Sequence, residues 1–471
     1  MSKKKILLLS DDMRIPSGVG TMSNALVVNT IHKYDWAQIG GAVKHPEKGK
    51  KFDVGKSIGE KMGVEDAYCK IYPVDGYGNE QILRDVCEIE KPDAIMHFTD
   101  PRFWGWLYAM EHELRQTMPL MYLNIWDDLP FPHWNENFYE SCDLLMAISK
   151  QTYNINRNVC KRKPRVEGKD LFYVQHGISK KDYYPLSDSE KTSKEFTELK
   201  TQICGNHPRD FVVLFNSRNI QRKRTSDLIL AYRKMCDTLT PEQAERCLLI
   251  LHTDPVDQHG TDLPAVVNAL CPKYPVAFSP NKISVQQLNY LYNIADVTAN
   301  PSSAEGFGLS HMESLMAGTP TVTTVIGGLQ DQMGFKNADG KYITTDDFSS
   351  EFPSNSTGMI SRDHGEWTYP LWPQMNIQGS PQTPYIYDSR PNINDIADGL
   401  KHWYNLSKED RIKRGKSGRE WSIEHGFTHK GMGDAAINAI DTCFKEFVPR
   451  NKFQIIDTVE KPIKYEEGIL I

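Results

Sequence analysis

The chain has 471 residues, of which 39% are hydrophobic and 25% are charged, and its formal net charge is -6. This composition is typical of a folded globular protein, and the negative charge excludes a chain built as a whole to bind polyanions. Because a chain of this length exceeds what one hydrophobic core usually fills, we expect two domains.

Two features bear on where the protein works. Nine cysteines are scattered along the chain without a closely spaced pair or the spacing of a zinc site, which indicates free thiols in a reducing compartment. The apolar run at residues 6–9 is too short for a signal peptide and is stopped by Asp11 and Asp12, so we interpret it as a strand. Since no apolar stretch approaches membrane-spanning length, we expect a cytoplasmic protein.

The first part of the chain alternates between strand-like and helix-like segments. A buried strand at residues 6–9 is followed by a turn with Gly18 and Gly20 and by a helix at residues 21–32. Strand, glycine turn and helix in this order open many nucleotide-binding α/β units. Further strands are expected at residues 94–96, 120–123, 144–147 and 171–174. The alternation predicts a mostly parallel sheet with helices on both faces.

A second α/β series follows residues 182–210, which are rich in Ser, Thr, Lys and Glu and which we interpret as a linker between domains. Ser284 is a suitable N-cap for one helix of this series. We expect strands at residues 211–215, 247–251, 297–299 and 321–324, and helices at residues 226–235, 285–293, 309–317, 393–406 and 431–447.

Residues 344–390 interrupt the second series. They are rich in Pro, Ser and Asp, but they also contain several large aromatic side chains, which argue against full disorder. Long loops inside compact domains are usually functional when they are ordered. Either an ordered flap near a bound substrate or a packed surface excursion fits this segment. Its large rings are Trp367, Tyr369, Trp372, Tyr385 and Tyr387.

Residues 305–313 carry the most chemical information. They place two carboxylates, Glu305 and Glu313, around a glycine-containing loop at the start of an expected helix. A helix N-terminus offers unpaired N–H groups and a positive dipole end to an anion, and the carboxylates can accept hydrogen bonds from hydroxyls on either side of it. A ligand with a diphosphate between two polyols is a nucleotide-sugar. For Glu313 alone, an ordinary acid in the first turn of a helix remains the alternative.

The block at residues 288–328 resembles the signature of the retaining glycosyltransferases of the GT-B fold, and more narrowly their family 4. The agreement in residue type and spacing is close here, and it is thinner but in the right order over nearly the whole chain. The residues that agree with this signature are Asp296-Val297, Pro301-Ser302-Ser303, Glu305-Gly306-Phe307-Gly308-Leu309, Glu313-Ser314-Leu315-Met316-Ala317-Gly318-Thr319-Pro320 and Gly327-Gly328.

The resemblance implies two Rossmann-like domains whose parallel sheets face each other across a cleft. The N-terminal domain, on the acceptor side, would comprise residues 1–185 and be completed by a C-terminal helix at about 428–471. The second domain, which would bind the nucleotide-sugar, would comprise residues 205–427 with an insertion at about 344–390.

The resemblance also implies roles for individual residues. Arg218 and Lys223 would hold the donor diphosphate and stabilise the leaving nucleotide, although a basic surface loop is the alternative interpretation of this segment. Glu305 would lie against the donor sugar, and Glu313 would bind the ribose. Arg224 departs from the family pattern, which has glycine there. The backbone around the diphosphate would come from Gly306, Phe307, Gly308, Leu309 and Ser310, with Gly18 and Gly20 approaching from the other domain.

The acceptor side is less well marked. Trp126 stands where many relatives carry a histidine, which leaves Asp127 and Asp128 as polar candidates. His97 and Asp100 follow another expected strand and are further acceptor-side candidates, with core or loop-capping roles as the alternative.

A soluble acceptor is expected, because no basic amphipathic helix indicates binding to a membrane surface. Residues 11–20 and 126–128 resemble glycosyltransferases encoded by large tailed bacteriophages, some of which glycosylate hydroxymethylated pyrimidines in DNA. A phage-encoded member would work in the host cytoplasm. The basic run at residues 157–169 favours modified DNA as an acceptor, and the acidic net charge counts against it.

The resemblance implies transfer of a hexosyl or pentosyl group from a nucleotide-diphosphate-sugar such as a UDP-sugar, with retained configuration by same-face attack. The chain contains no Asp-x-Asp triplet, so we expect neither a metal ion on the diphosphate nor a required cofactor. A sugar-nucleotide epimerase, a phosphorolytic enzyme and a catalytically inactive binding module on the same fold are the alternatives. No motif resembles the pyridoxal-phosphate lysine that a phosphorylase would need.

Overall fold

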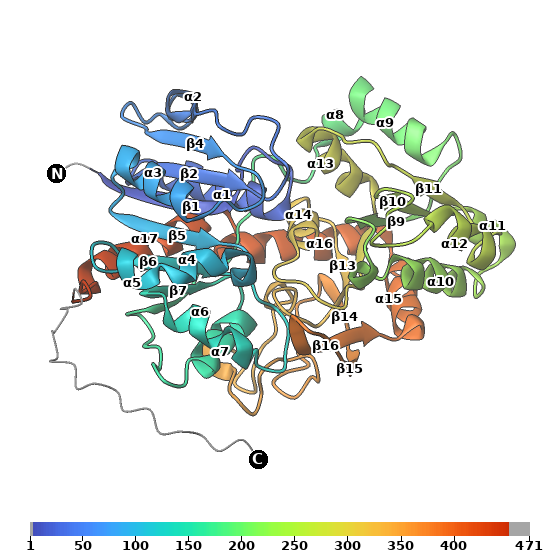
Figure 1. The fold of residues 1–471 in the computed structure, drawn as a ribbon. Coiled ribbons are helices and arrows are strands. Elements are labelled where there is room, and N and C mark those ends of the chain that lie inside the picture. The colour runs from blue at the N-terminus through green and yellow to red at the C-terminus, as the bar shows by residue number, and fades with distance from the viewer. Residues whose placement is uncertain (1–2, 452–471) are drawn as a thin grey trace, which may run out of the picture.

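Two sheets made mainly of parallel strands organise residues 3–451, the part of the chain that the computed structural model describes. Figure 1 shows them as two lobes, a blue-to-cyan N-terminal lobe and a green-to-yellow second lobe, each with helices packed around its sheet. The predicted α/β fold with two mostly parallel sheets is confirmed. The boundaries of the two domains stay a prediction.

The first sheet has eight strands in the order β3-β4-β2-β1-β5-β6-β7-β8, and only β3 with β4 is antiparallel. Along β1, Ile6 and Leu8 enter one buried cluster while Leu7 and Leu9 enter another, so both faces of the strand are covered. This explains its continuous apolar sequence. The strands are β1 Lys4–Asp11, β2 Tyr34–Gly41, β3 Phe52–Asp53, β4 Cys69–Pro73, β5 Ala94–Phe98, β6 Leu120–Asn124, β7 Leu144–Ala147 and β8 Leu171–Tyr173.

The helices of the first lobe connect these strands. The first of them begins at Gly18, because Ser17 is its N-cap and accepts a hydrogen bond from the N–H of Gly20 at 2.9 Å. Gly18 and Gly20 therefore lie in the first turn of the helix, which begins earlier than residue 21. The helices are α1 Gly18–Thr30, α2 Gly55–Met62, α3 Glu80–Glu90, α4 Gly105–Ala109, α5 Glu111–Leu114, α6 Glu136–Glu140 and α7 Lys150–Val159, with short 3-10 turns at Pro101–Trp104 and His133–Asn135.

The second sheet has six strands in the order β11-β10-β9-β12-β13-β14, and its neighbouring strands pair in parallel. Its strands are β9 Phe211–Asn216, β10 Cys247–His252, β11 Val276–Phe278, β12 Val297–Asn300, β13 Thr321–Thr324 and β14 Thr368–Leu371. Its helices are α10 Thr225–Cys236, α11 Pro241–Glu245, α12 Leu263–Leu270, α13 Val285–Ile294, α14 Leu309–Met316 and α15 Ile393–Asn405, with 3-10 turns at Gln221–Lys223, Gln330–Gln332 and Thr345–Asp347.

The linker interpretation of residues 182–210 needs a correction, because this segment contains two helices, α8 Asp188–Lys191 and α9 Lys194–Cys204. Ser187 and Ser193 cap them, so part of the polar composition belongs to helix N-termini. The ring of Phe196 in α9 meets the ring of Tyr290 in α13 edge-on at 5.5 Å between centroids. The segment therefore packs against the second lobe.

The insertion interpretation of residues 344–390 also needs a correction. Within it, β14 pairs with β13 and is the edge strand of the second sheet. After β14, the chain forms an antiparallel hairpin of β15 Pro373–Ser380 and β16 Thr383–Pro391. The N–H of Tyr387 donates to the carbonyl of Leu129 in the first lobe at 2.7 Å. The hairpin thus bridges the two lobes, which its Pro-rich and Asp-rich sequence did not reveal.

Two C-terminal helices, α16 Lys408–Glu424 and α17 His429–Glu446, run from the second lobe back to the first and are drawn in red in Figure 1. The hydroxyl of Tyr34, at the start of β2, donates to Asp441 of α17 at 2.7 Å, which ties the helix to the N-terminal lobe. Of the helix expected at about 428–471, residues 452–471 lie outside the described part. Among residues 3–451, none of the helices is both long enough and apolar enough to span a membrane.

Candidate active site

A cluster of opposite charges lies where β9 and β12 end. Lys223, in the 3-10 turn after β9, is buried, and its ammonium group donates to the Glu305 carboxylate after β12. The guanidinium of Arg222 approaches the same Glu305 oxygen at 3.0 Å. Because the carboxyl ends of neighbouring parallel strands meet at one edge of a sheet, two loops far apart in sequence converge there. The structure thus brings together two of the three predicted catalytic residues.

The charges in this cluster set one another's protonation. Burial by itself would raise the pKa of Glu305, but Lys223 and Arg222 outweigh it and hold that pKa below its ordinary value. Burial lowers the pKa of Lys223, and Glu305 opposes that change. Glu305 is therefore ionised near neutral pH and neutralises cations that a bound diphosphate would otherwise contact.

Arg218 does not join this cluster. Its side chain is 61% exposed and pairs with Asp257 at 3.2 Å. The guanidinium at Glu305 is instead that of Arg222, which we did not single out from the sequence. The reason is the tight turn at Gln221–Lys223, which ends at Arg224 in the left-handed conformation with φ 55° and points residues 222 and 223 at Glu305. The role of Arg218 on the diphosphate stays a prediction.

The N-terminus of α14 faces the first lobe across the junction. Gly308 precedes α14 with φ 90°, and no side chain of the described residues caps the helix. A Cβ atom built on Gly18 would lie 3.7 Å from Leu309 Cδ1, so the first turns of α1 and α14 are neighbours. A Cβ on Gly306 would lie 3.1 Å from the carbonyl oxygen of Ile125, after β6. Backbone N–H groups at the start of α14 are thus available to an anion between the lobes.

Gly18 and Gly20 should respond differently to substitution. A Cβ on Gly20 would lie 2.5 Å from the carbonyl oxygen of Ile15 and 2.8 Å from that of Asp12, whereas Gly18 has room for one. We expect Gly20→Ala to lower the free energy of unfolding by about 1–3 kcal/mol. Gly18→Ala should change it by less than about 0.5 kcal/mol and weaken UDP binding, because the added methyl group narrows the approach to α14. Thermal melts and UDP titrations of both variants measure this; equal destabilisation by the two substitutions would contradict it.

The other residues expected on the donor have mixed surroundings. The Glu313 carboxylate accepts from the Tyr292 hydroxyl at 2.7 Å, and burial raises its pKa against the hydrogen bonds from Tyr292 and Tyr183. The ring of Phe307 is buried against His176, so only the backbone of Phe307 is suited to a ligand. Leu309 and Ser310 are half-buried in the first turn of α14. The contacts of these residues with a donor stay predictions.

Asp127 and Asp128 lie beside the charge cluster, in the loop after β6. They line a recess of about 20 Å³ that Ser303, Ala304 and Tyr387 also border. Burial, with a smaller contribution from Glu305, raises the pKa of Asp127 to about 6, and Arg222 opposes the change. Burial and the neighbouring Asp127 raise the pKa of Asp128 well above its ordinary value. Two carboxyl groups with raised pKa values thus border the Glu305 cluster from the other lobe.

Replacing Asp127 with asparagine should remove a step in the pH dependence of the transfer rate. If the ionised carboxylate orients the acceptor, wild-type activity falls as the pH drops through about 6, and Asp127→Asn has low activity without that step. For stability the sign is opposite. Folding raises the pKa of Asp127 from 3.8 to about 6, so the folded chain binds this proton more tightly than the unfolded chain. The resulting contribution to the free energy of unfolding is fully present below pH 3.8 and is lost as the pH rises through 6. Between pH 4 and pH 8 the variant should therefore gain about 1–3 kcal/mol relative to wild type.

Rates and denaturant unfolding curves at pH 4–8 measure both effects. Asp339→Asn, on an exposed loop, is the control and should change neither profile. An Asp127→Asn profile that keeps the step at pH 6 would contradict the assignment.

His97 lies in the core, which is the alternative that the sequence left open for it. Its ring is fully buried beneath the sheet, stacks on Tyr122 at 4.7 Å between centroids and contacts the Tyr108 hydroxyl at 3.1 Å. Burial lowers its pKa to about 3. Because side chains alternate along a strand, a polar residue near a strand end can point into the core as easily as towards the cleft. Asp100 accepts from the backbone N–H of Arg102 at 3.0 Å, which is the loop-capping alternative, and its contact with an acceptor stays a prediction.

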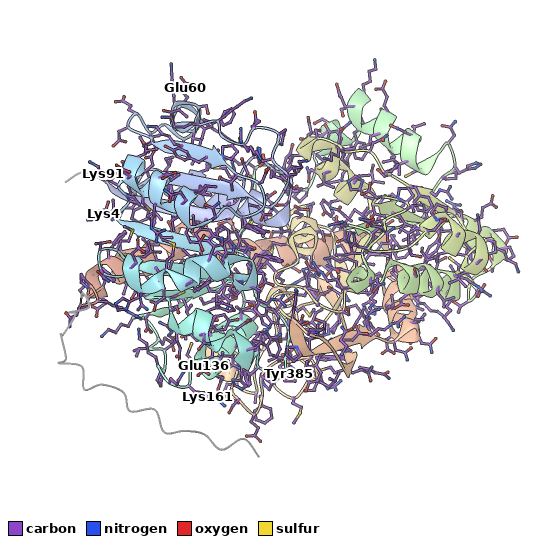
Figure 2. The ribbon with its side chains drawn as sticks, in the orientation of Figure 1. Lys4, Glu60, Lys91, Glu136, Lys161 and Tyr385 are labelled. Atoms are coloured by element: carbon purple, nitrogen blue, oxygen red, sulfur yellow. The ribbon has the colours of Figure 1, made fainter. Side chains whose placement is uncertain are left out.

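The basic run at residues 157–169 is largely engaged within the protein. Arg157 donates to the carbonyl of Phe348, and Arg162 pairs with Glu140 at 3.0 Å. Arg165 is buried against Asp170, and Lys169 pairs with Glu446 at 3.4 Å. Figure 2 shows Lys161 near Glu136, whose carboxylate accepts from the Lys161 backbone at 3.2 Å. The run therefore gives little support to DNA as the acceptor. Within residues 3–451, no three His, Cys, Asp or Glu side chains gather as a metal-ligand set.

Comparisons with known proteins agree with this geometry. Residues 275–344, which include Glu305 and α14, match the family model described as "Glycosyl transferases group 1". The chain is 26% identical over 195 residues to mannosylfructose-phosphate synthase of Agrobacterium fabrum, covering 41% of this chain and 39% of that protein. It is 30% identical over 174 residues to D-inositol 3-phosphate glycosyltransferase of Salinispora arenicola, covering 36% and 38%. These matches thus span less than half the length of either curated relative.

Solved structures resemble the chain over nearly its whole length. Alr3699/HepE of Anabaena, solved with UDP and glucose, has a TM-score of 0.62 at 15% identity, covering 93% of this chain and 100% of that one. Sucrose-phosphate synthase of Thermosynechococcus elongatus has a TM-score of 0.62 at 15% identity, covering 94% and 100%. At this level of identity the likeness concerns the fold, and it confirms the predicted arrangement of two Rossmann-like lobes.

Proposed function

This chain carries a glycosyl transferases group 1 domain on a GT-B fold, and from that premise we propose that it is a retaining, metal-independent glycosyltransferase using a UDP-sugar. The observation that carries the proposal is the convergence of Lys223 and Arg222 on Glu305 beside the uncapped N-terminus of α14. Two cations and a helix end suit a diphosphate, and a carboxylate suits sugar hydroxyls. The UDP in the Anabaena structure supports uridine as the nucleotide.

The positive groups would act on the leaving nucleotide. As the bond from the anomeric carbon to the β-phosphate oxygen breaks, its electron pair stays on that oxygen, and negative charge grows there. Lys223, Arg222 and the N–H groups of α14 are fixed before the reaction, so they stabilise this charge more than the ground state. They supply the charge that a divalent metal supplies at other diphosphate sites, and chelators should therefore leave turnover unchanged.

The acceptor would enter from the side of the first lobe. Its hydroxyl oxygen bonds to the anomeric carbon on the face that the nucleotide leaves, and its proton passes to the departing phosphate oxygen. Asp127 and Asp128 border this region and can accept hydrogen bonds from an acceptor polyol. No carboxylate is assigned as a nucleophile on the opposite face, which is why same-face attack is proposed rather than a covalent intermediate.

A screen of donors and acceptors tests the proposal. Purified protein is incubated with UDP-sugars, alone and with monosaccharides, polyols, sugar phosphates or hydroxymethylated DNA, and both UDP release and product anomer are measured. Acceptor-dependent UDP release with retained configuration supports transfer. Conversion of the donor alone to an epimer, phosphate-dependent release of a sugar phosphate, or UDP binding without turnover on any acceptor would instead favour an epimerase, a phosphorylase or a binding module.

A further inference from the structure

A second recess lies on the far edge of the second sheet from the charge cluster. It has a volume of about 950 Å³ and is lined by Val212 and Asp296. These residues lie at the amino ends of β9 and β12, whereas Lys223 and Glu305 follow the carboxyl ends of the same strands. Since both strands run in parallel, the sheet itself separates the recess from the proposed donor site.

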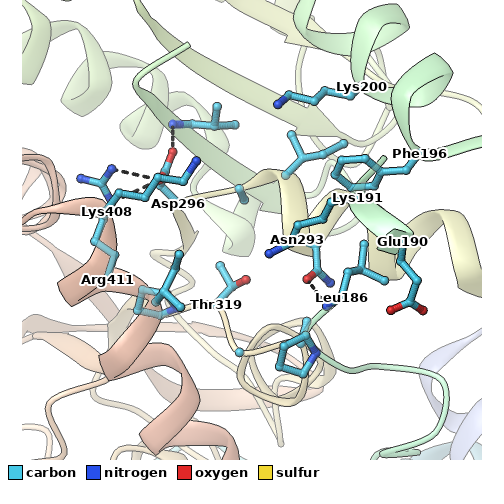
Figure 3. Close-up of a pocket in the computed structure, with 18 of the residues that line it drawn as sticks. Leu186, Glu190, Lys191, Phe196, Lys200, Asn293, Asp296, Thr319, Lys408 and Arg411 are labelled. Carbon is cyan, nitrogen blue, oxygen red and sulfur yellow. Dashed lines mark hydrogen bonds and ion pairs between the residues drawn. The ribbon is translucent and has the colours of Figure 1, made fainter. Parts of the chain in front are cut away.

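The recess is walled by two segments that the sequence sets far apart. On one side stand α8 and α9 of the segment between the lobes, with Lys191 and Lys200; on the other stands the start of α16, with Lys408. Figure 3 shows Lys191 and Lys200 on one side of the opening and Lys408 with Arg411 across it. Lys416, one turn further along α16 than Arg411, also lines the recess.

The acidic groups of the recess are mostly engaged, and the lysines are not. Asp296 pairs with Arg411 at 3.0 Å and accepts from the N–H of Val212 at 2.8 Å. Asp210 pairs with Arg246 at 2.6 Å, and Glu190 accepts from its capping partner Ser187. By contrast, the lysines that line the recess, Lys191, Lys200, Lys408 and Lys416, form no ion pair with any of the described residues. Asp188 and Glu190 also line the recess and keep their negative charges, but these four lysines outnumber them, so the recess carries a net positive charge.

We propose that this recess is a second ligand site, which binds a small anion with several phosphate groups, such as the triphosphate of a nucleotide. Lysine ammonium groups bind phosphates as point charges, and several of them around one hollow match a compact polyanion better than a single charge. The volume suits a small molecule rather than a flat macromolecular surface. A bound anion would link α9 to α16, and thereby join the segment between the lobes to the helix that returns to the first lobe.

Titration with inorganic tripolyphosphate tests the site. The titration is done without UDP at about 0.1 M salt, where charges within about 10 Å still interact. A parallel titration of Lys223→Ala identifies any binding in the donor cleft. The pocket variant combines Lys191→Ala, Lys200→Ala and Lys408→Ala. The control variant removes the same charge outside the recess by combining Lys181→Ala, Lys194→Ala and Lys413→Ala. All three positions are exposed; Lys194 lies on α9, Lys413 on α16, and Lys181 precedes α8.

We expect one saturable site per chain, a higher melting temperature with tripolyphosphate, and binding about 100-fold weaker in the pocket variant. The control variant should bind within about threefold of wild type, and Lys223→Ala should bind tripolyphosphate with unchanged stoichiometry at this site. Equal weakening in the pocket and control variants, or no saturable binding by the wild-type protein, would overturn the proposal. Because Lys223→Ala alters only the donor cleft, neither outcome depends on whether the chain transfers a sugar.

Discussion

Replacing Lys223 with alanine is expected to lower kcat/KM for the UDP-sugar by about 10²–10³-fold and to weaken UDP binding. Removing one preorganised positive group from a site that stabilises developing charge typically costs this much. Lys223 is buried, its ammonium group is held at Glu305, and the turn contains no second lysine that could take its place. Steady-state rates and UDP titration measure the two effects.

A series of arginine variants separates the sequence-based assignment from the observed contacts. Arg222→Ala should lower kcat/KM by about 10–100-fold, because Arg222 contacts Glu305, and Arg218→Ala should have a smaller effect. Arg84→Ala, in an exposed ion pair with Glu113 on the first lobe, is the control and should leave turnover unchanged. A larger loss in Arg218→Ala than in Arg222→Ala would show that the arginine chosen by resemblance holds the diphosphate after all.

Replacing Glu305 with glutamine should separate binding from turnover. Without a ligand, the Glu305 carboxylate accepts from both Lys223 and Arg222, and the substitution frees these cations for a diphosphate. We therefore expect kcat to fall by about 10²–10³-fold while UDP binds at least as tightly as to wild type. The unliganded variant should also be less stable by about 3–5 kcal/mol, because it leaves a buried charge unpaired, and UDP should restore part of this stability.

Calorimetric titration with UDP, melts with and without UDP, and initial rates check this pattern. The control is Glu366→Gln, at an exposed position where the Ser417 hydroxyl donates to the carboxylate at 3.1 Å. Weaker UDP binding in Glu305→Gln together with normal turnover would rule out the role proposed for Glu305.

The sequence predicted the two parallel sheets because their central strands are buried on both faces and are therefore continuously apolar. Strands such as β1 and β9 carry continuous apolar runs, and the motif at residues 305–313 follows one such strand. The family resemblance implied that Lys223 and Glu305 share one site, and their contact has a geometric reason, because the carboxyl ends of parallel strands lie at one edge of the sheet. By contrast, β2 was missed, since Asp35, Gln38 and its glycines give it no apolar run.

Details that depend on local geometry could not be predicted. Which of Arg218 and Arg222 faces Glu305 depends on a three-residue turn and on the left-handed conformation of Arg224. Whether His97 points into the core or the cleft depends on the register of β5, which a single polar residue does not set. The hairpin that joins the lobes is held by hydrogen bonds to Leu129 and Arg224. The hairpin's own sequence does not indicate these partners.

The central claim is that a diphosphate binds between the lobes, on Lys223 and the N-terminus of α14. A crystal structure of the chain with UDP tests it most directly. The account predicts phosphate oxygens within hydrogen-bonding distance of Lys223 Nζ and of the first backbone N–H groups of α14, with Gly18 against the nucleotide from the other lobe. UDP bound elsewhere, with the ion pair of Lys223 and Glu305 unchanged and no phosphate at α14, would contradict it.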